Sequence, residues 1–322
     1  MKKIISIMLC VVLASVCFAG CKTDKNLIRL NEVTHSIFYA PLYLAMNLGF
    51  MEEEGMKINL TSGGGSDGSM AALLSGNSDM ALLGPETVVY VTSQGSTNHP
   101  MIFGQLTKRD GSFLVSRTNE TNFDWSKLEN KYVIGGRRGG LPAMTLEYIV
   151  NSRGLKNGTN ITLNLDLAFD MVVPTFKSGT GDYCTMFEPT ASDYQAKGNG
   201  YIVASLGEVS GEIPYTCFMA SPKFLNNNPD KIKGFLRAIK KAYAYIQTHS
   251  SEEVANGLKA SFSTTSLELI ISSVNSYKRI DAWMSSPAMT EASFNRLLEV
   301  IKNSGTTVTN VDFLDVVTYS IA

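Results

Sequence analysis

The chain contains an internal repeat, and this feature constrains its fold more than any other. Two stretches of roughly 65 residues share landmarks in the same order. Residues 75–79 (SGNSD) correspond to residues 178–182 (SGTGD), and residues 43–50 (YLAMNLGF) correspond to residues 148–155 (YIVNSRGL). Units of this length are too long for a solenoid repeat and predict two similar lobes.

Each unit alternates strand-like and helix-like segments, which predicts an α/β fold. Four loops should follow strands: residues 31–40 and 84–86 in the first unit, and residues 136–145 and 187–189 in the second. Ligands of open α/β sheets bind outside the carboxyl ends of the strands. The sequence therefore predicts one ligand cleft between the lobes, bordered by all four loops.

Two extended stretches should connect the lobes, at residues 111–116 and 212–218. Two such crossings form a hinge. We expect one lobe to comprise residues 28–114 and 215–322, and the other residues 115–214. Helices are expected from residue 221 to about 303. Their apolar stripes should pack on the first lobe: Ile232, Phe235, Leu236, Ile239 and Tyr243, then Phe294, Leu297, Leu298 and Ile301.

The loop GGRRGGLPAM, residues 135–144, is not a nucleotide motif. A Walker loop needs Lys and then Ser or Thr where Leu141 and Pro142 stand, and no register of the glycines produces G-x-G-x-x-G. Glycines still allow close approach of backbone to a ligand, and helix N-termini attract acceptor groups. Of the two arginines, we expect Arg138 to add the charge. An ordinary strand-to-helix turn is the alternative.

Residues 64–68 (GGSDG) form a literal G-x-S-x-G between a strand and a helix, as in serine hydrolases. Only one strand and one helix precede it, and neither His99 nor His249 has an acidic partner in the sequence. We prefer helix capping by Ser66, Asp67 or Ser69.

The first residues resemble an export signal, with Lys2 and Lys3 before an apolar run. The run ends in small residues before Cys21, similar to the lipobox of bacterial lipoproteins. We expect a signal peptide over residues 1–20, a lipid on Cys21 and a linker over residues 21–27. A plain secretory signal is the alternative.

The composition narrows the possible partners. The formal net charge of −1 gives no reason to expect nucleic acid. His35, His99 and His249 are scattered, so no metal and no cofactor are expected. Cys184 and Cys217 form either a disulfide or two free buried thiols.

The segment HSIFYAPLYLA (residues 35–45), followed by LGFMEEEG (48–55) and LSGNSD (74–79), resembles a known family. It is similar to the solute-binding proteins for thiamine-pyrimidine precursors, aliphatic sulfonates, taurine and nitrate. The resemblance implies a two-lobed fold of the periplasmic binding protein type II. It also implies an ABC importer with permease and ATPase partners, a small-molecule ligand, a monomer, and anchoring by lipid alone at the extracytoplasmic face of a bacterial membrane. No catalysis is implied. Yeast pyrimidine synthases share the fold, but the sequence around Cys217 does not reproduce their Cys-rich motif.

The candidate ligand-binding residues lie in the predicted cleft loops: His35, Tyr39, Ser66, Asp67, Gly84, Glu86, Arg138, Gly139, Gly140, Phe187 and Glu188, with Arg109 and Trp283 ranked lower. In pyrimidine-binding relatives an acidic residue bonds the heterocycle and aromatic residues stack on it. Carboxylates of Glu86 and Glu188 at strand ends would repel an anion and accept from N–H groups. We therefore favour a nitrogen-containing organic ligand; a sulfonate, taurine or nitrate bound mainly by Arg138 is the alternative.

Overall fold

The computed structural model describes residues 24–318, and the first repeat unit forms three parallel strands within them. These strands lie in the order β2-β1-β3, so the first strand is central. The elements are β1 (Leu27–Glu32), α2 (Ala40–Asn47), α3 (Phe50–Glu53), β2 (Lys57–Ser62), α4 (Ser66–Leu74), β3 (Met80–Leu83) and α5 (Glu86–Ser93). A short 3-10 turn, η1 (Ile37–Tyr39), precedes α2.

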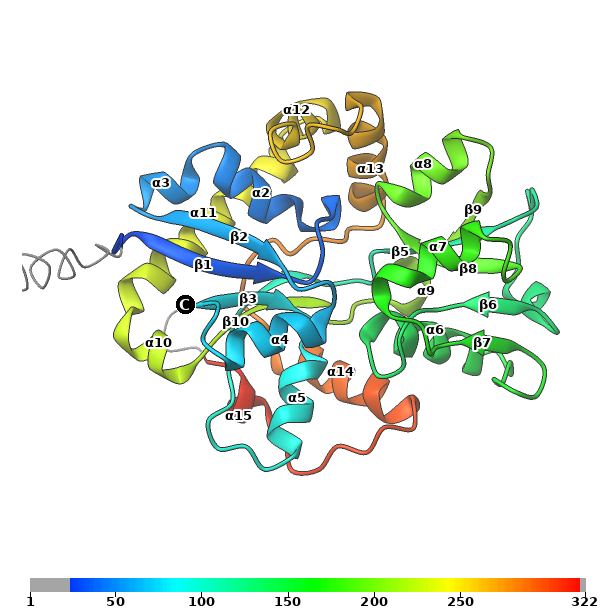
Figure 1. Cartoon of the computed structure of the whole chain (residues 1–322), viewed down its shortest axis with the longest axis horizontal. Helices are drawn as coiled ribbons and strands as arrows, with labels where there is room; N and C mark the ends of the chain where they lie inside the picture. The colour runs from blue at the N-terminus through cyan, green and yellow to red at the C-terminus, as the bar shows by residue number, and fades with distance from the viewer. Residues whose placement is uncertain (1–23, 319–322) are drawn as a thin grey trace, which may run out of the picture.

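The second repeat unit has the same topology, with parallel strands in the order β7-β6-β8. Its elements are β6 (Tyr132–Ile134), α6 (Leu141–Asn151), β7 (Thr162–Asn164), η3 (Phe169–Met171), α7 (Val172–Lys177), β8 (Tyr183–Phe187) and α8 (Thr190–Ala196). Another 3-10 turn, η2 (Trp125–Leu128), precedes it. The repeat in the sequence thus corresponds to two similar three-stranded units, and the predicted α/β fold class is confirmed (Figure 1).

Two further strands complete each sheet, and the first strand added to each is antiparallel to its neighbours. The first sheet gains β10 (Thr216–Ala220) and β4 (Met101–Thr107), and the second gains β5 (Ser112–Ser116) and β9 (Tyr201–Ser205). All of β5 pairs within the second sheet. The boundary expected after residue 114 therefore falls inside a strand, and the chain crosses between the sheets before Ser112.

The two crossings lie side by side and are hydrogen-bonded to each other. The Ile213 N–H donates to the Lys108 carbonyl at 2.9 Å, and the Tyr215 N–H donates to the Thr107 carbonyl at 3.2 Å. Asp110 lies fully buried here and accepts from the Ser112 N–H and hydroxyl at 2.7 and 2.6 Å. Burial raises the pKa of Asp110 to about 6.

The remaining chain is mainly helical, as predicted. The short helix α9 (Leu206–Ser210) belongs to the second lobe, and the helices after β10 are α10 (Pro222–Asn227), α11 (Pro229–Thr248), α12 (Ser251–Leu258), α13 (Leu267–Arg279), α14 (Glu291–Asn303) and α15 (Phe313–Val316). The predicted stripe of α11 is buried, and this helix packs on α2 and α3 of the first lobe. Between residues 24 and 318, no helix has the length and apolar character needed to cross a membrane.

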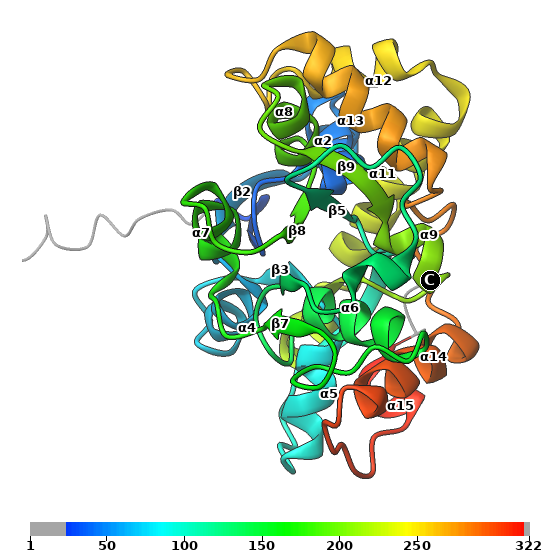
Figure 2. The same ribbon diagram turned by 90° about the vertical axis from the view of Figure 1, so that its right-hand side faces the viewer.

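Two of these helices contact the second lobe as well, which the sequence did not predict. α14 packs against α6, where Arg296 donates to the Tyr148 hydroxyl at 2.7 Å and lies over its ring. α13 packs against α8 (Figures 1 and 2). The expectation that the α14 stripe packs on the first lobe was therefore incomplete, because the helix lies between the lobes. Cys184 and Cys217 are both free and buried, one in each sheet.

We expect Gly68→Ala to lower the free energy of unfolding by about 1–3 kcal/mol. A Cβ atom at Gly68 would lie 2.1 Å from the Gly63 carbonyl oxygen, so the backbone loop before α4 would have to move. Urea unfolding measures the loss. Ala71→Ser on the exposed side of the same helix is the control and should change stability by less than about 0.5 kcal/mol. Equal stability of the two variants would contradict this packing.

Candidate functional site

Two adjoining cavities lie between the lobes, at the carboxyl ends of the parallel strands. They enclose about 60 and 110 Å³. The same residues border both cavities: Thr34, Ser36, Pro142, Phe169 and Phe187. We call the two together the cleft. All four loops that the sequence placed at the strand ends contribute to its walls.

Glu86 lies at the start of α5 and is the most deeply buried acid of the smaller cavity. Only 2% of the residue is exposed. Burial raises the pKa of its carboxyl to about 7, although hydrogen bonds from the Glu86 and Leu141 amides oppose this shift. Its Oε2 atom has no hydrogen-bond partner among the described residues. An unpaired buried acceptor is costly, so the site favours a hydrogen-bond donor there.

Gly84 makes room for this carboxyl group. A Cβ atom at Gly84 would lie only 2.0 Å from one Glu86 carboxylate oxygen. Any side chain at position 84 would therefore displace the acid from the cavity.

Aromatic rings surround the acid. Phe38 is in contact with Tyr39, Phe187 and Tyr215, at centroid distances of 5.7, 5.6 and 5.7 Å. Phe169, from the second lobe, lies 5.8 Å from Phe187. Burial raises the pKa of the Tyr39 phenol, which therefore stays neutral. The smaller cavity offers flat apolar surfaces close to the buried carboxyl group of Glu86.

Glu188 occupies the equivalent position in the second lobe but has a different role. Its carboxylate accepts from the Ser192 N–H at 2.9 Å and from the Ser192 hydroxyl at 2.7 Å. Its backbone carbonyl accepts from Ser36 of the first lobe at 2.8 Å. Although Glu188 borders the larger cavity, its carboxylate holds the first turn of α8. Ser192 thus engages both carboxylate oxygens of Glu188, whereas one oxygen of Glu86 has no partner among the described residues, and the predicted contact of Glu188 with a ligand stays a prediction.

The two arginines of the glycine-rich loop point in different directions. Arg137 borders the smaller cavity and lies 3.4 Å from Asp67 of the first lobe. Arg138 is exposed, lies 3.5 Å from Asp166 and borders neither cavity. Arg137, and not Arg138, therefore borders the cleft, and the predicted contact of Arg138 with a ligand stays a prediction. An isolated β-bridge between Arg137 and Asp166 sets the direction of the side chains in this loop.

The glycines of the same loop form a contact between the lobes. Gly139 has a φ of +79°, and its carbonyl accepts from the Tyr90 hydroxyl of α5 at 3.0 Å. Gly140 borders the smaller cavity and precedes α6, which has Pro142 in its first turn. Gly139 thus lies behind the cleft wall and Gly140 in it.

Ser66 and Asp67 border the smaller cavity from the first lobe, as the sequence predicted. The Ser66 hydroxyl accepts from the Gly84 N–H at 3.4 Å. The expected capping is absent, because Gly65 occupies the N-cap of α4 and no side chain caps this helix. The uncapped first turn is a place for an acceptor group of a ligand.

His35 borders the larger cavity, but protein groups engage both of its ring nitrogens. Nδ1 lies 3.1 Å from Glu32, and Nε2 lies 2.8 Å from the Ser261 carbonyl. The ring stacks on Phe262, and the hydrogen bond to Glu32 raises the pKa of the imidazole. His35 thus shapes the cavity and has no ring nitrogen left for a ligand.

The lower-ranked candidates lie elsewhere. Arg109 borders neither cavity and pairs with Glu212 near the crossings. Trp283 is buried and donates to the Phe38 carbonyl at 2.8 Å, so it supports the aromatic wall from behind. Other residues that border the smaller cavity were not predicted as ligand-binding residues from the sequence: Val33, Thr34, Ser36, Phe38, Arg137, Leu141, Pro142, Phe169, Tyr215 and Thr216. Tyr215 could have been found, because it lies in a predicted crossing.

The structure gives the hydrolase motif no partner. The side chains of His35, His99 and His249 form hydrogen bonds with other groups, so no imidazole in the described part of the chain bonds Ser66. Residues 24–318 contain no group of three His, Cys, Asp or Glu side chains that could hold a metal ion. Cys21 lies outside the described residues.

Known proteins resemble this chain in sequence and in fold. Residues 34–258 match the model of the NMT1-like family. A Bacillus subtilis protein named "Putative binding protein YtlA" is 39% identical over 306 residues, which cover 94% of this chain and 92% of the relative. A yeast relative from Saccharomyces cerevisiae, 4-amino-5-hydroxymethyl-2-methylpyrimidine phosphate synthase THI11, is 22% identical over 70% of this chain and 67% of its own length.

Among solved structures, the alkanesulfonate-binding protein SsuA from Xanthomonas axonopodis pv. citri has a similar fold. Its TM-score is 0.74 at 14% identity, over 92% of this chain and 99% of SsuA. The chain therefore has the fold of the binding proteins of ABC-type import systems, as the sequence predicted. It belongs to the NMT1-like family.

Proposed function

We propose that the chain is the extracytoplasmic solute-binding component of an ABC importer and that it closes on a small nitrogen-containing organic ligand, such as a thiamine-like pyrimidine. The unpaired Oε2 of buried Glu86 is the observation that carries the ligand class. A ligand N–H would supply the missing donor, and a flat heterocycle would fit between the rings. The names of the relatives support the transport role but specify no ligand for this chain.

Closure would depend on contacts between the lobes. The Tyr90–Gly139 hydrogen bond and the Asp67–Arg137 pair both join the first lobe to the glycine-rich loop. A ligand that adds bonds to both sides stabilises the closed state, since only differential binding shifts the equilibrium. In this proposal the protein works as a monomer, held at the membrane by a lipid on Cys21, and delivers the ligand to permease and ATPase subunits.

An organic anion such as a sulfonate is the second candidate. The uncapped first turn of α4 and the guanidinium of Arg137 both border the smaller cavity and would favour negative charge. When Glu86 is ionised, its negative charge would disfavour the binding of an anion. We propose no catalysis by the chain; labelling of Ser66 by a fluorophosphonate would overturn that part of the proposal.

The ligand class can be tested by thermal shift with pyrimidines, flavins, polyamines, sulfonates and nitrate. A ligand at one hundred times its Kd adds about 2.7 kcal/mol of stability. We expect a nitrogen heterocycle to stabilise the protein, and Glu86→Gln to weaken its binding about tenfold or more because a buried charge-assisted hydrogen bond is lost. Glu129→Gln, at an exposed site outside the cleft, is the control and should bind normally. Stabilisation by sulfonates or nitrate alone would reject the heterocycle in favour of the second candidate.

The raised pKa of Glu86 predicts a specific pH dependence. The folded pKa of about 7 exceeds the ordinary carboxyl pKa of 4.5, so the folded protein binds the proton more tightly than the unfolded chain. The free energy of unfolding of the wild type, relative to Glu86→Gln, should therefore fall by about 2–3 kcal/mol between pH 5 and 8. Urea unfolding of both proteins across this range measures the difference. Parallel curves would show that Glu86 does not titrate in this range.

A further inference from the structure

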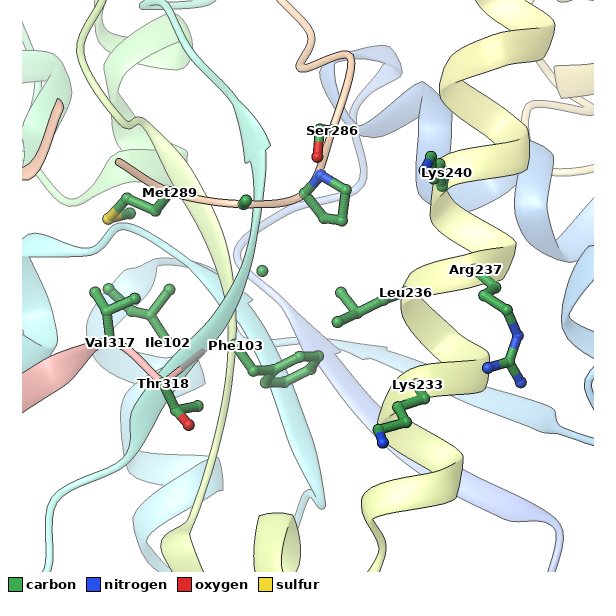
Figure 3. A pocket seen from close by; sticks show the side chains of 13 residues that line it. Ile102, Phe103, Lys233, Leu236, Arg237, Lys240, Ser286, Met289, Val317 and Thr318 are labelled. Atoms are coloured by element: carbon green, nitrogen blue, oxygen red, sulfur yellow. The ribbon is translucent and has the colours of Figure 1, made fainter. Parts of the chain in front are cut away.

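A third cavity, separate from the cleft and of about 350 Å³, lies on the first lobe between the edge strand β4 and helix α11. None of the residues that line it borders the cleft. Its walls are mostly apolar and include Ile102, Phe103, Leu236, Pro287 and Val317. In Figure 3 the side chains of Leu236 and Phe103 lie close together on one side of the cavity, and Ser286 lies on another.

The cavity lies in a gap along the outer edge of β4. On one side of the gap, the Thr318 N–H donates to the Ile102 carbonyl at 2.9 Å; on the other, the Gln105 N–H donates to the Pro287 carbonyl at 2.7 Å. Between these points the strand contributes Phe103 and Gly104 to the cavity. A Cβ atom at Gly104 would lie 2.9 Å from Leu236, so the glycine allows the leucine to pack closely on the strand.

Helix α11 places cations along the rim of this apolar space. Lys233, Arg237 and Lys240 all border it and are exposed. Arg237 is already paired with Glu54 at 2.6 Å and points away from the cavity in Figure 3. Lys233 and Lys240 have no hydrogen bond or ion pair with any residue in the described part of the chain. They lie two helical turns apart, about 10 Å, with Leu236 between them.

We propose that this cavity binds a small organic anion with an apolar body, such as a medium-chain carboxylic acid. The apolar body would contact Phe103 and Leu236, and the acid group would pair with Lys233 or Lys240. Small-molecule sites in proteins typically have volumes of about 300 Å³ or more. If each heavy atom with its hydrogens takes up about 30 Å³, as a water molecule does, this cavity holds roughly a dozen heavy atoms. A diacyl lipid has several times as many heavy atoms as this cavity holds, so a single-chain acid of about ten heavy atoms is the ligand that matches its volume.

Sodium octanoate is the probe for this site. Methyl NMR of the full chain should show a saturable shift of the Leu236 methyl groups on titration with octanoate. The double variant Lys233→Met/Lys240→Met keeps most of the apolar stem of each lysine but removes its charge. We expect it to weaken octanoate binding about five- to tenfold, because exposed ion pairs contribute modestly. Octanol, which lacks the charge, should bind more weakly than octanoate to the wild type and equally to both proteins.

Lys302→Met is the matched control, because Lys302 is also an exposed lysine on a helix but lies outside the cavity. It should bind octanoate as the wild type does, and urea unfolding should show that all variants fold. Undiminished binding in the double variant, or octanol binding as tightly as octanoate, would overturn the anion specificity. Shifts at the methyl groups of Leu141 and Val172 in the cleft without any at Leu236 would overturn the site itself.

Discussion

The hydrogen bonds between the two crossings are the constraint on which the rest of the structure depends. They hold the Thr107–Lys108 backbone against Ile213 and Tyr215, where the chain enters and leaves the second sheet. Because both crossings run together, the two sheets keep their strand ends directed to one cleft. Tyr215 connects the two regions, since it belongs to a crossing and also borders the smaller cavity.

The strand order of the two sheets could be predicted from the sequence, because the repeat implies that both units have the same topology. Matching landmarks in the same order imply matching strand order, and β2-β1-β3 and β7-β6-β8 agree with this. The position of α14 could not be predicted in this way. Its apolar stripe shows that one face is buried but not which lobe covers it, and Arg296 bonding to Tyr148 depends on the completed fold.

The cleft loops could be predicted, whereas the directions of their side chains could not. Arg137 and Arg138 are adjacent, so a bridge to Asp166 that sets the local backbone also decides which of them reaches the ligand space. Glu86 and Glu188 match by position, but Ser192 lies one helical turn after Glu188 and takes up its carboxylate. The sequence shows a serine four residues after the acid. Whether that serine bonds the carboxylate depends on the short helix that brings the two side chains together.

Because of this difference between the acids, the two lobes would contribute different kinds of contact to a ligand. Glu86 travels with the first lobe and keeps a free oxygen, while the second lobe contributes glycine backbone and ring surfaces such as Phe169. In the proposed function, a solute held by that oxygen would have its strongest bond on the first lobe. When the lobes separate it would remain on the first lobe and show its other face to the opening, so release would follow a fixed order and the solute would leave in one orientation.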